Sequence, residues 1–88
     1  MPPYVIPPKF KKVLAKKPVE MQSAVLECIV RLGENPRHPG LQVHKVQGVR
    51  GVWEAYVDRA NRVTFHYAAD GTIVLRANCN HSILNRNP

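Results

Sequence analysis

The sequence predicts an α+β domain in which a short N-terminal strand and a helical hairpin pack on one face of a small antiparallel sheet. Two observations indicate this class. Apolar residues recur at steps of three and four between residues 18 and 33, which is typical of a helix. After residue 51, three β-rich runs follow one another with short turns between them. A length of 88 residues suits one domain, 1–88, with a single modest core. The expected order is β-α-α-β-β-β.

The N-terminal segment is predicted to form an edge strand and a first helix. Residues 4–6, "YVI", lie between two Pro-Pro pairs, and proline is tolerated at sheet edges because it cannot donate to a ladder. In "KFKKVLAKK", Phe10, Val13 and Leu14 form one narrow apolar stripe at helical spacing. The remaining circumference carries Lys9, Lys11, Lys12, Lys16 and Lys17.

A second helix is predicted to begin at Pro18, because the missing N–H of proline is not needed at the first helical position. Gly33 suits the left-handed position that follows a helix end. The apolar stripe between them consists of Met21, Val25, Cys28, Ile29 and Leu32. The two segments therefore indicate a helical hairpin joined near residues 17–18.

The C-terminal half is predicted to be a loop followed by three antiparallel strands. The loop, 34–51, has a short extended piece at 41–46, and the strands lie within 52–58, 62–68 and 72–78. Asp70-Gly71 favours a two-residue hairpin turn. Alternation along the strands gives one apolar face for the helices to cover. The opposite face, either an ordinary solvated surface or a working one, gathers Glu54, Tyr56, Arg62, His66, Arg76 and Asn78.

The charge balance favours a polyanionic partner. The chain has 13 Lys and Arg against 6 Asp and Glu, a net charge of +7, and nucleic acid is the first candidate for such a basic domain. The lysines between residues 9 and 17 are either a solvated helix face or a track for RNA phosphates. Apolar runs are too short for a membrane helix or a secretory signal, and two cysteines are too few for a disulfide framework. We therefore expect a soluble cytoplasmic protein with no membrane partner.

Arginines and a histidine near the sheet suggest RNA cleavage without a metal. Arg62 and Arg76 can clamp phosphate oxygens, and His81, in "NHSIL", can transfer a proton near neutral pH. In such a reaction the ribose 2′-OH attacks the adjacent phosphate while a base and an acid move protons. Two simpler interpretations compete: His81 caps the last strand, or Arg62 forms a structural pair with Glu54. No CxxC pair is present, so we expect no metal and no cofactor.

An ordered set of segments gives the chain a family resemblance. "FKKVLAKKP", "LQVHKVQGVRGVWEAYV", "RVTFHY" and "LRANCNHSIL" occur in the order expected for the RelE/ParE superfamily of bacterial type II toxins, which the chain resembles over nearly its full length. The resemblance implies a messenger-RNA interferase that acts on the ribosome and is neutralised by a cognate antitoxin. It also implies a ParE-like inhibitor of DNA gyrase as an alternative, and a catalytically silent binding protein as another.

The same resemblance implies roles for individual residues. Arg62 matches the arginine that contacts the scissile phosphate, His81 matches a C-terminal general acid, and His44 lies near the position of the base. Glu54 would orient the arginine and His66 would have a supporting role. Lys45 and Arg50 are expected to contact RNA. The chain departs from the pattern at Tyr56, where many relatives have arginine, and at Ser82, where several have tyrosine; either departure favours the silent alternative.

Overall fold

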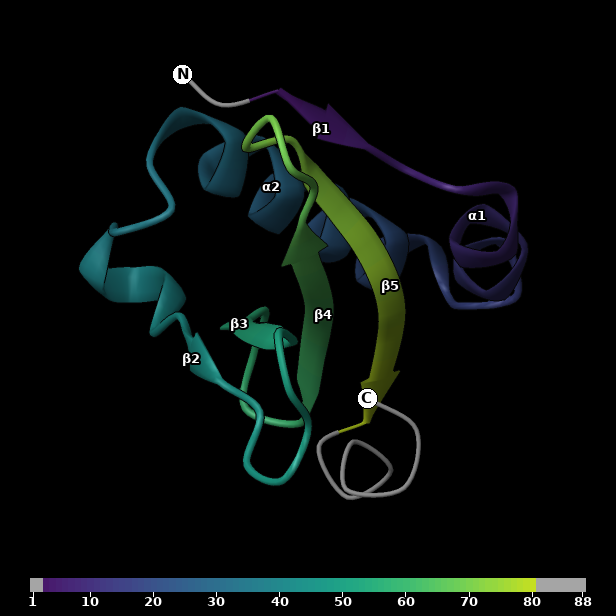
Figure 1. Ribbon diagram of the computed structural model, residues 1–88. Helices are drawn as coiled ribbons and strands as arrows, with labels where there is room; N and C mark the ends of the chain where they lie inside the picture. Colours follow the sequence, from purple (N-terminus) through teal and green to yellow (C-terminus); the bar gives the residue numbers. More distant parts are fainter. Residues whose placement is uncertain (1–2, 81–88) are drawn as a thin grey trace.

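The computed structural model describes residues 3–80 and has two helices packed on a five-stranded sheet (Figure 1). The strands lie in the order β1-β5-β4-β3-β2, with β1 parallel to β5 and every other pair antiparallel. This arrangement confirms the predicted α+β class. The elements are β1 (Tyr4–Val5), α1 (Pro8–Ala15), α2 (Val19–Glu34), the 3-10 turn η1 (Pro39–Leu41), β2 (His44–Lys45), β3 (Trp53–Tyr56), β4 (Asn61–Tyr67) and β5 (Ile73–Asn80).

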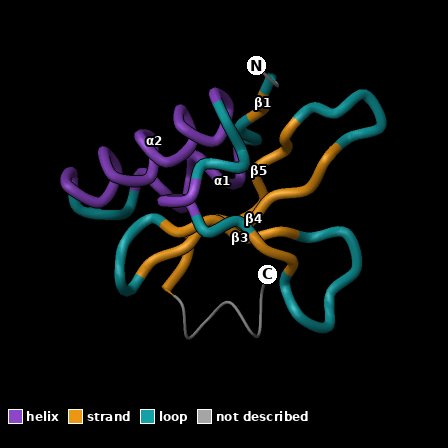
Figure 2. The backbone as a smooth tube through the Cα atoms, turned by 90° about the vertical axis from the view of Figure 1, so that its left-hand side faces the viewer, coloured by secondary structure: helices purple, strands orange, loops and turns teal. Residues whose placement is uncertain are grey.

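The core lies between the helices and one face of the sheet, and both helices lie on the same side of it (Figure 2). Prolines precede each helix, Pro7 before α1 and Pro18 before α2, as their fixed φ favours. The predicted stripe of α2 is buried, with Met21 partly so. The buried core consists of Phe10, Leu14, Val25, Cys28, Ile29, Leu32, Leu41, Ala55, Val63, Phe65, Ile73 and Leu75.

Two helix predictions are wrong in detail. Val13 was expected in the core stripe of α1, but it is 43% exposed, because the narrow stripe of this short helix buries only Phe10 and Leu14. Gly33 was expected just beyond the end of α2, but it is buried inside the last turn. The backbone N–H of Asn35 still donates to the Arg31 carbonyl, 2.9 Å away, so the helix continues past the glycine to Glu34.

The β4–β5 turn is longer than predicted. Ala68 N donates to the Thr72 carbonyl at 2.8 Å, so the loop comprises residues 69–71 rather than Asp70-Gly71 alone. Gly71 has φ +89°, the left-handed conformation that closes loops of this length and that glycine adopts without strain. The Asp70 carboxylate accepts the Thr72 N–H at 3.0 Å, and the side chain of Thr72, followed by this backbone donor, lowers the pKa of Asp70.

A β-bulge in β5 changes which side chains reach each face. Thr64 pairs with Ala77 but the next residue, Phe65, pairs with Leu75, so Arg76 is an extra residue in β5. Beyond the bulge the alternation is shifted by one. Asn78, expected on the polar face, is therefore turned toward the helices, where it is 3% exposed and its Nδ2 donates to the Phe10 carbonyl at 3.2 Å.

Candidate functional site

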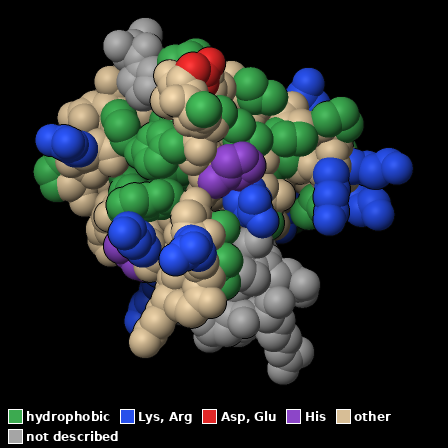
Figure 3. All heavy atoms as spheres, viewed as in Figure 1, with side chains coloured by type: hydrophobic (Ala, Val, Ile, Leu, Met, Phe, Trp, Pro, Cys, Tyr) green, Lys and Arg blue, Asp and Glu red, His purple; other side chains and the backbone are tan. Residues whose placement is uncertain are grey.

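The sheet face opposite α2 carries the catalytic and supporting residues singled out from the sequence that lie within residues 3–80. The cross-strand pairs His44–Glu54, Glu54–Thr64 and Tyr56–Arg62 place these side chains on the same face. Figure 3 looks onto this face and shows a histidine beside a Lys or Arg side chain near its middle. The face was predicted to be solvated or functional, yet Glu54 is 3% exposed and Thr64 is fully buried.

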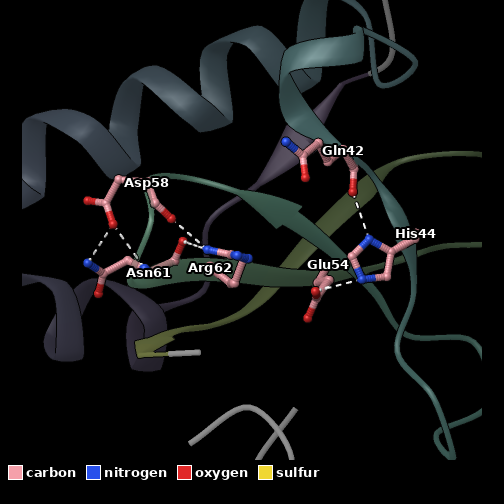
Figure 4. A network of polar contacts seen from close by, with 6 residues as sticks. All are labelled: Gln42, His44, Glu54, Asp58, Asn61 and Arg62. Atoms are coloured by element: carbon pink, nitrogen blue, oxygen red, sulfur yellow. Dashed lines mark hydrogen bonds and ion pairs between the residues drawn. The ribbon is translucent and has the colours of Figure 1, made fainter. Parts of the chain in front are cut away.

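Arg62 is held by the turn that precedes β4 (Figure 4). Its Nη1 donates to the carbonyls of Asp58 at 2.5 Å and Asn61 at 2.9 Å. Its guanidinium carbon lies 4.7 Å from the centre of the Tyr56 ring, within cation–π range. Within residues 3–80 these are the two hydrogen bonds that the Arg62 side chain makes, and both use Nη1. The Nη2 and Nε groups are therefore the donors that a phosphate can take.

The turn itself is organised by Asp58. One carboxylate oxygen accepts the backbone N–H groups of Ala60 and Asn61 and the Nδ2 of Asn61, each at 2.9 Å. The Asn61 side chain, followed by the two backbone donors and the nearby Arg62 charge, lowers the pKa of Asp58. The sequence analysis missed this turn. An aspartate at the start of a short polar turn was the signal, because its side chain can accept backbone N–H groups two and three residues later.

His44 and Glu54 form an ion pair across β2 and β3 (Figure 4). His44 Nε2 lies 2.6 Å from the Glu54 carboxylate, and Nδ1 lies 2.7 Å from the Gln42 carbonyl. The Glu54 side chain is 4% exposed and that of His44 is 59% exposed. The expected role of Glu54 in orienting Arg62 requires a contact between these two side chains. Glu54 pairs with His44 instead.

The same contacts bear on the expected base role of His44. Both ring nitrogens face acceptor oxygens, and only the imidazolium form carries an N–H on each nitrogen. A neutral ring requires that Glu54 hold the shared proton instead. In either case neither nitrogen has a lone pair free to accept a proton from a substrate. His44 acts as a base only as a neutral ring that has left Glu54 or Gln42, so an imidazolium must first give its extra proton to Glu54 or to solvent.

Arg76 lies away from Arg62 and contacts His66. The Nη1 of Arg76 is 3.2 Å from His66 Nδ1. Arginine has donors only, so in this contact Nδ1 of His66 is the acceptor. Arg62 pairs with Cys79 and His66 pairs with Val74. Arg62 and His66 are therefore separated along β4 by roughly 13 Å, at about 3.3 Å per residue.

The other predicted RNA contacts occupy different surfaces. Lys45 belongs to the face opposite His44, and its Nζ lies 5.5 Å from the Trp53 ring centre. Arg50 is exposed in the loop before β3. Of the lysines in and just after α1, Lys17 is partly buried, and the exposed ones are Lys9, Lys11, Lys12 and Lys16. His81 and Ser82 lie outside the described residues.

Three further observations concern metals, thiols and membranes. Within residues 3–80 no group of three His, Cys, Asp or Glu side chains is arranged to hold a metal ion. Burial raises the pKa of Cys28 to about 11, against the opposing charge of Arg31, so this cysteine stays a protonated thiol. In the part of the chain that the structure describes, none of the helices combines the length and apolarity needed to cross a membrane.

Comparison with known proteins gives the fold relationship. No protein-family model and no curated protein matches the sequence. Among solved structures, a chain of the archaeal RelE–RelB complex from Pyrococcus horikoshii superposes with a TM-score of 0.72 at 19% identity, covering 90% of this chain and 93% of that one. The toxin–antitoxin complex RelBE2 from Mycobacterium tuberculosis gives 0.74 at 16% identity, covering 92% and 100%.

A third solved structure extends the same relationship. The YoeB/ParE toxin from Agrobacterium tumefaciens gives a TM-score of 0.72 at 12% identity and covers 90% of this chain and 98% of that one. Each match spans nearly all of both chains, so the likeness includes the whole arrangement of helices and sheet. The protein has the RelE-like fold of the RelE/ParE-type toxins.

Proposed function

We propose that this protein is the toxin of a type II toxin–antitoxin pair and that it cleaves messenger RNA on the ribosome by metal-independent acid–base chemistry. The observation that carries the proposal is Arg62 on the uncovered face of a RelE-like sheet. Its Nη1 is tied to two backbone carbonyls, and its Nη2 and Nε donors remain for a phosphate. The net charge of +7 supports a polyanionic substrate.

The proposed reaction assigns one task to each group. The 2′-OH attacks the neighbouring phosphorus, the bond from phosphorus to the 5′ oxygen breaks, and the products are a 2′,3′-cyclic phosphate and a 5′-OH. Arg62 donates to the non-bridging oxygens, whose charge grows in the transition state. His81 protonates the leaving 5′ oxygen. His44 takes the 2′-OH proton as a neutral ring, once it has given its extra proton to Glu54 or to solvent and substrate binding has displaced one of its two acceptors.

Single substitutions test these assignments. Purified protein is added to programmed ribosomes, and the 5′ ends of the cleaved messenger are mapped. We expect Arg62→Ala to lower the cleavage rate about 10²- to 10³-fold, the usual cost of a lost transition-state donor. We expect His81→Ala to lower it about 10²- to 10⁴-fold. Arg59→Ala, an exposed arginine of the same turn, is the matched control. Unchanged cleavage by Arg62→Ala would reject the assignment.

Two observations favour a second candidate, a catalytically silent RelE-fold protein that only binds a partner. Both nitrogens of His44 are engaged, and the Arg62 guanidinium lies on Tyr56, where related sequences carry a further arginine. Expression in cells separates the candidates: a silent protein is harmless and leaves messenger intact. A ParE-like gyrase inhibitor would change DNA supercoiling before it affected messenger.

We propose a cognate antitoxin as the protein partner. RelE–RelB and RelBE2 are complexes of a toxin with its antitoxin, and this chain shares their fold. An acidic antitoxin segment would also complement a chain of charge +7. Co-expression with the product of a neighbouring reading frame tests this, because a true antitoxin restores growth and co-purifies with the protein. Such a toxin acts in the cytoplasm, where its ribosomal target is.

A further inference from the structure

An open groove separates α1 from β5 on the face that carries Arg76. Its volume is about 560 Å³, and its lining residues include no acid. The cationic or polar side chains along it are Lys9, His66, Arg76 and Asn78, and the apolar ones include Phe10, Val13 and Val74. In Figure 3 the Lys and Arg side chains at the α1 side and at the middle of this face flank a strip of hydrophobic atoms.

The β5 bulge builds this groove. The extra residue, Arg76, lies exposed on the open face, where it reaches His66. The shift of alternation turns Asn78 inward, and its Nδ2 holds the Phe10 carbonyl of α1 at 3.2 Å. Asn78 Oδ1 is buried and has no hydrogen-bond partner among the described residues. The bulge thus places Arg76 in the groove and, through Asn78, fixes the distance between α1 and β5, which form the two walls.

His66 fixes one edge of the Arg76 guanidinium. Nδ1 of His66 lies 3.2 Å from Nη1 and accepts a hydrogen bond from it, which holds that edge of the guanidinium. Within residues 3–80 the Arg76 guanidinium makes no other hydrogen bond, so its remaining donors can bind a ligand, and Lys9 supplies a second cation across the groove. The planar guanidinium of Arg76 and the ammonium of Lys9 can bind a phosphate, and the apolar side chains below them can contact the flat face of a base.

We propose that this groove is a binding subsite for one nucleotide of a single-stranded RNA, distinct from the phosphate at Arg62. Arg76 and Lys9 bind its phosphate, and the base lies against the apolar wall. The proposal rests on the proposed nuclease function, and it removes Arg76 from the catalytic residues. The 13 Å between Arg62 and His66 corresponds to about four nucleotides stacked at roughly 3.4 Å each, and to fewer in an extended strand.

Binding of uncleavable RNA tests the groove without catalysis. Fluorescence anisotropy is measured with 2′-O-methyl oligoribonucleotides of two and of six nucleotides, which lack the attacking hydroxyl. We expect Arg76→Ala to weaken binding of the longer RNA about tenfold and of the shorter one less than twofold. The slope of log affinity against log salt should fall by about 0.7, the effect of one lost phosphate contact on a single strand. Lys9→Ala should behave similarly.

Arg31→Ala is the matched control, because Arg31 is an exposed arginine of α2, which covers the other face of the sheet. Equal effects of Arg76→Ala and Arg31→Ala, or no effect of Arg76→Ala, would overturn the subsite. A parallel cleavage assay on programmed ribosomes should show a higher half-saturating protein concentration for Arg76→Ala with an unchanged maximal rate. A loss in the maximal rate would instead place Arg76 at the reacting phosphate and overturn the subsite.

The outcomes separate the two proposals. Binding that depends on Arg76, without cleavage by the wild type, would reject the nuclease and retain the RNA subsite. Cleavage by the wild type, with binding that does not depend on Arg76 or Lys9, would reject the subsite and retain the nuclease.

Discussion

The His44–Glu54 pair joins an almost fully buried carboxylate to an exposed imidazole. Burying a charge is costly unless it is paired, so the imidazole stabilises Glu54 as much as Glu54 orients the imidazole. Glu54 itself faces buried Thr64 across the strand, with Tyr56 and Arg62 on the same face. Breaking the pair from the exposed side therefore leaves a carboxylate with no compensating charge in contact.

Substitution of His44 should accordingly reduce stability. We expect His44→Ala to lower the free energy of unfolding by about 1–3 kcal/mol, the usual cost of an uncompensated buried polar group. Glu54→Gln should cost less, and the double variant should cost less than the sum of the two single variants, because each single change leaves a partner unpaired. Urea denaturation of the four proteins measures this cycle. Additive effects would show that the two side chains do not interact.

Asp58 should make the Arg62 turn sensitive to acid. Its pKa is lowered in the folded protein by the Asn61 side chain and the backbone donors, so ionised Asp58 stabilises the fold above its unfolded pKa of about 3.9. That contribution is lost as the pH falls through the lower, folded pKa. We expect Asp58→Ala to lower the melting temperature at pH 7 and to have a smaller effect below about pH 3.

A companion variant separates charge from hydrogen bonding in this turn. Asp58→Asn keeps an acceptor oxygen for the backbone N–H groups but not the charge, so at pH 7 its melting temperature should lie between those of the wild type and Asp58→Ala. A melting-temperature difference that stays constant from pH 7 to pH 2 would contradict the assigned role of the carboxylate.

At the scale of elements, the periodic patterns predicted α2 and the three long strands, because burial of one face determines both. The bulge in β5 was not predictable from the alternation of apolar and polar residues. The inserted residue, Arg76, reverses the two faces only for the residues that follow it in the strand. For this reason Glu54, Arg62 and His66 were placed on the correct face and Asn78 was not. The ion-pair partner of Glu54 could not be predicted from the sequence either, because both Arg62 and His44 could lie close enough to pair with it.

The β4–β5 loop offers a test of backbone strain alone. A Cβ at Gly71 would meet nothing within 4 Å, but its φ of +89° is unfavourable for any residue with a side chain. We expect Gly71→Ala to lower the free energy of unfolding by about 1 kcal/mol. For a domain of this size, that is a drop of roughly 4–8 °C in melting temperature. An unchanged melting temperature would show that the loop adopts another turn at no cost.

At the scale of the whole molecule, the two charge signs are segregated. Glu20, Glu27 and Glu34, half of the six acids, lie on α2, and Glu27 is paired there with Arg31 at 2.6 Å. Lys9 of α1 and Arg76 of β5 line the α1–β5 groove, and Figure 3 shows Lys and Arg side chains at the α1 side and near the middle of the face opposite α2. Such a distribution orients a polyanion toward that face and away from the outer surface of α2.

Matched charge removals on α1 distinguish this general field from a local site. We compare two double variants that each lower the net charge by two, Lys9→Gln/Lys12→Gln and Lys16→Gln/Lys17→Gln. Only the first pair lies beside the α1–β5 groove or in the adjoining concavity of Pro8 and Lys11. If the overall field alone attracts RNA, both double variants weaken binding of a six-nucleotide RNA equally. Because single-strand phosphate contacts are local and salt-dependent, we expect the first pair to lose at least fivefold more affinity at low salt. The difference should narrow as ionic strength rises, and anisotropy titrations at two salt concentrations measure it.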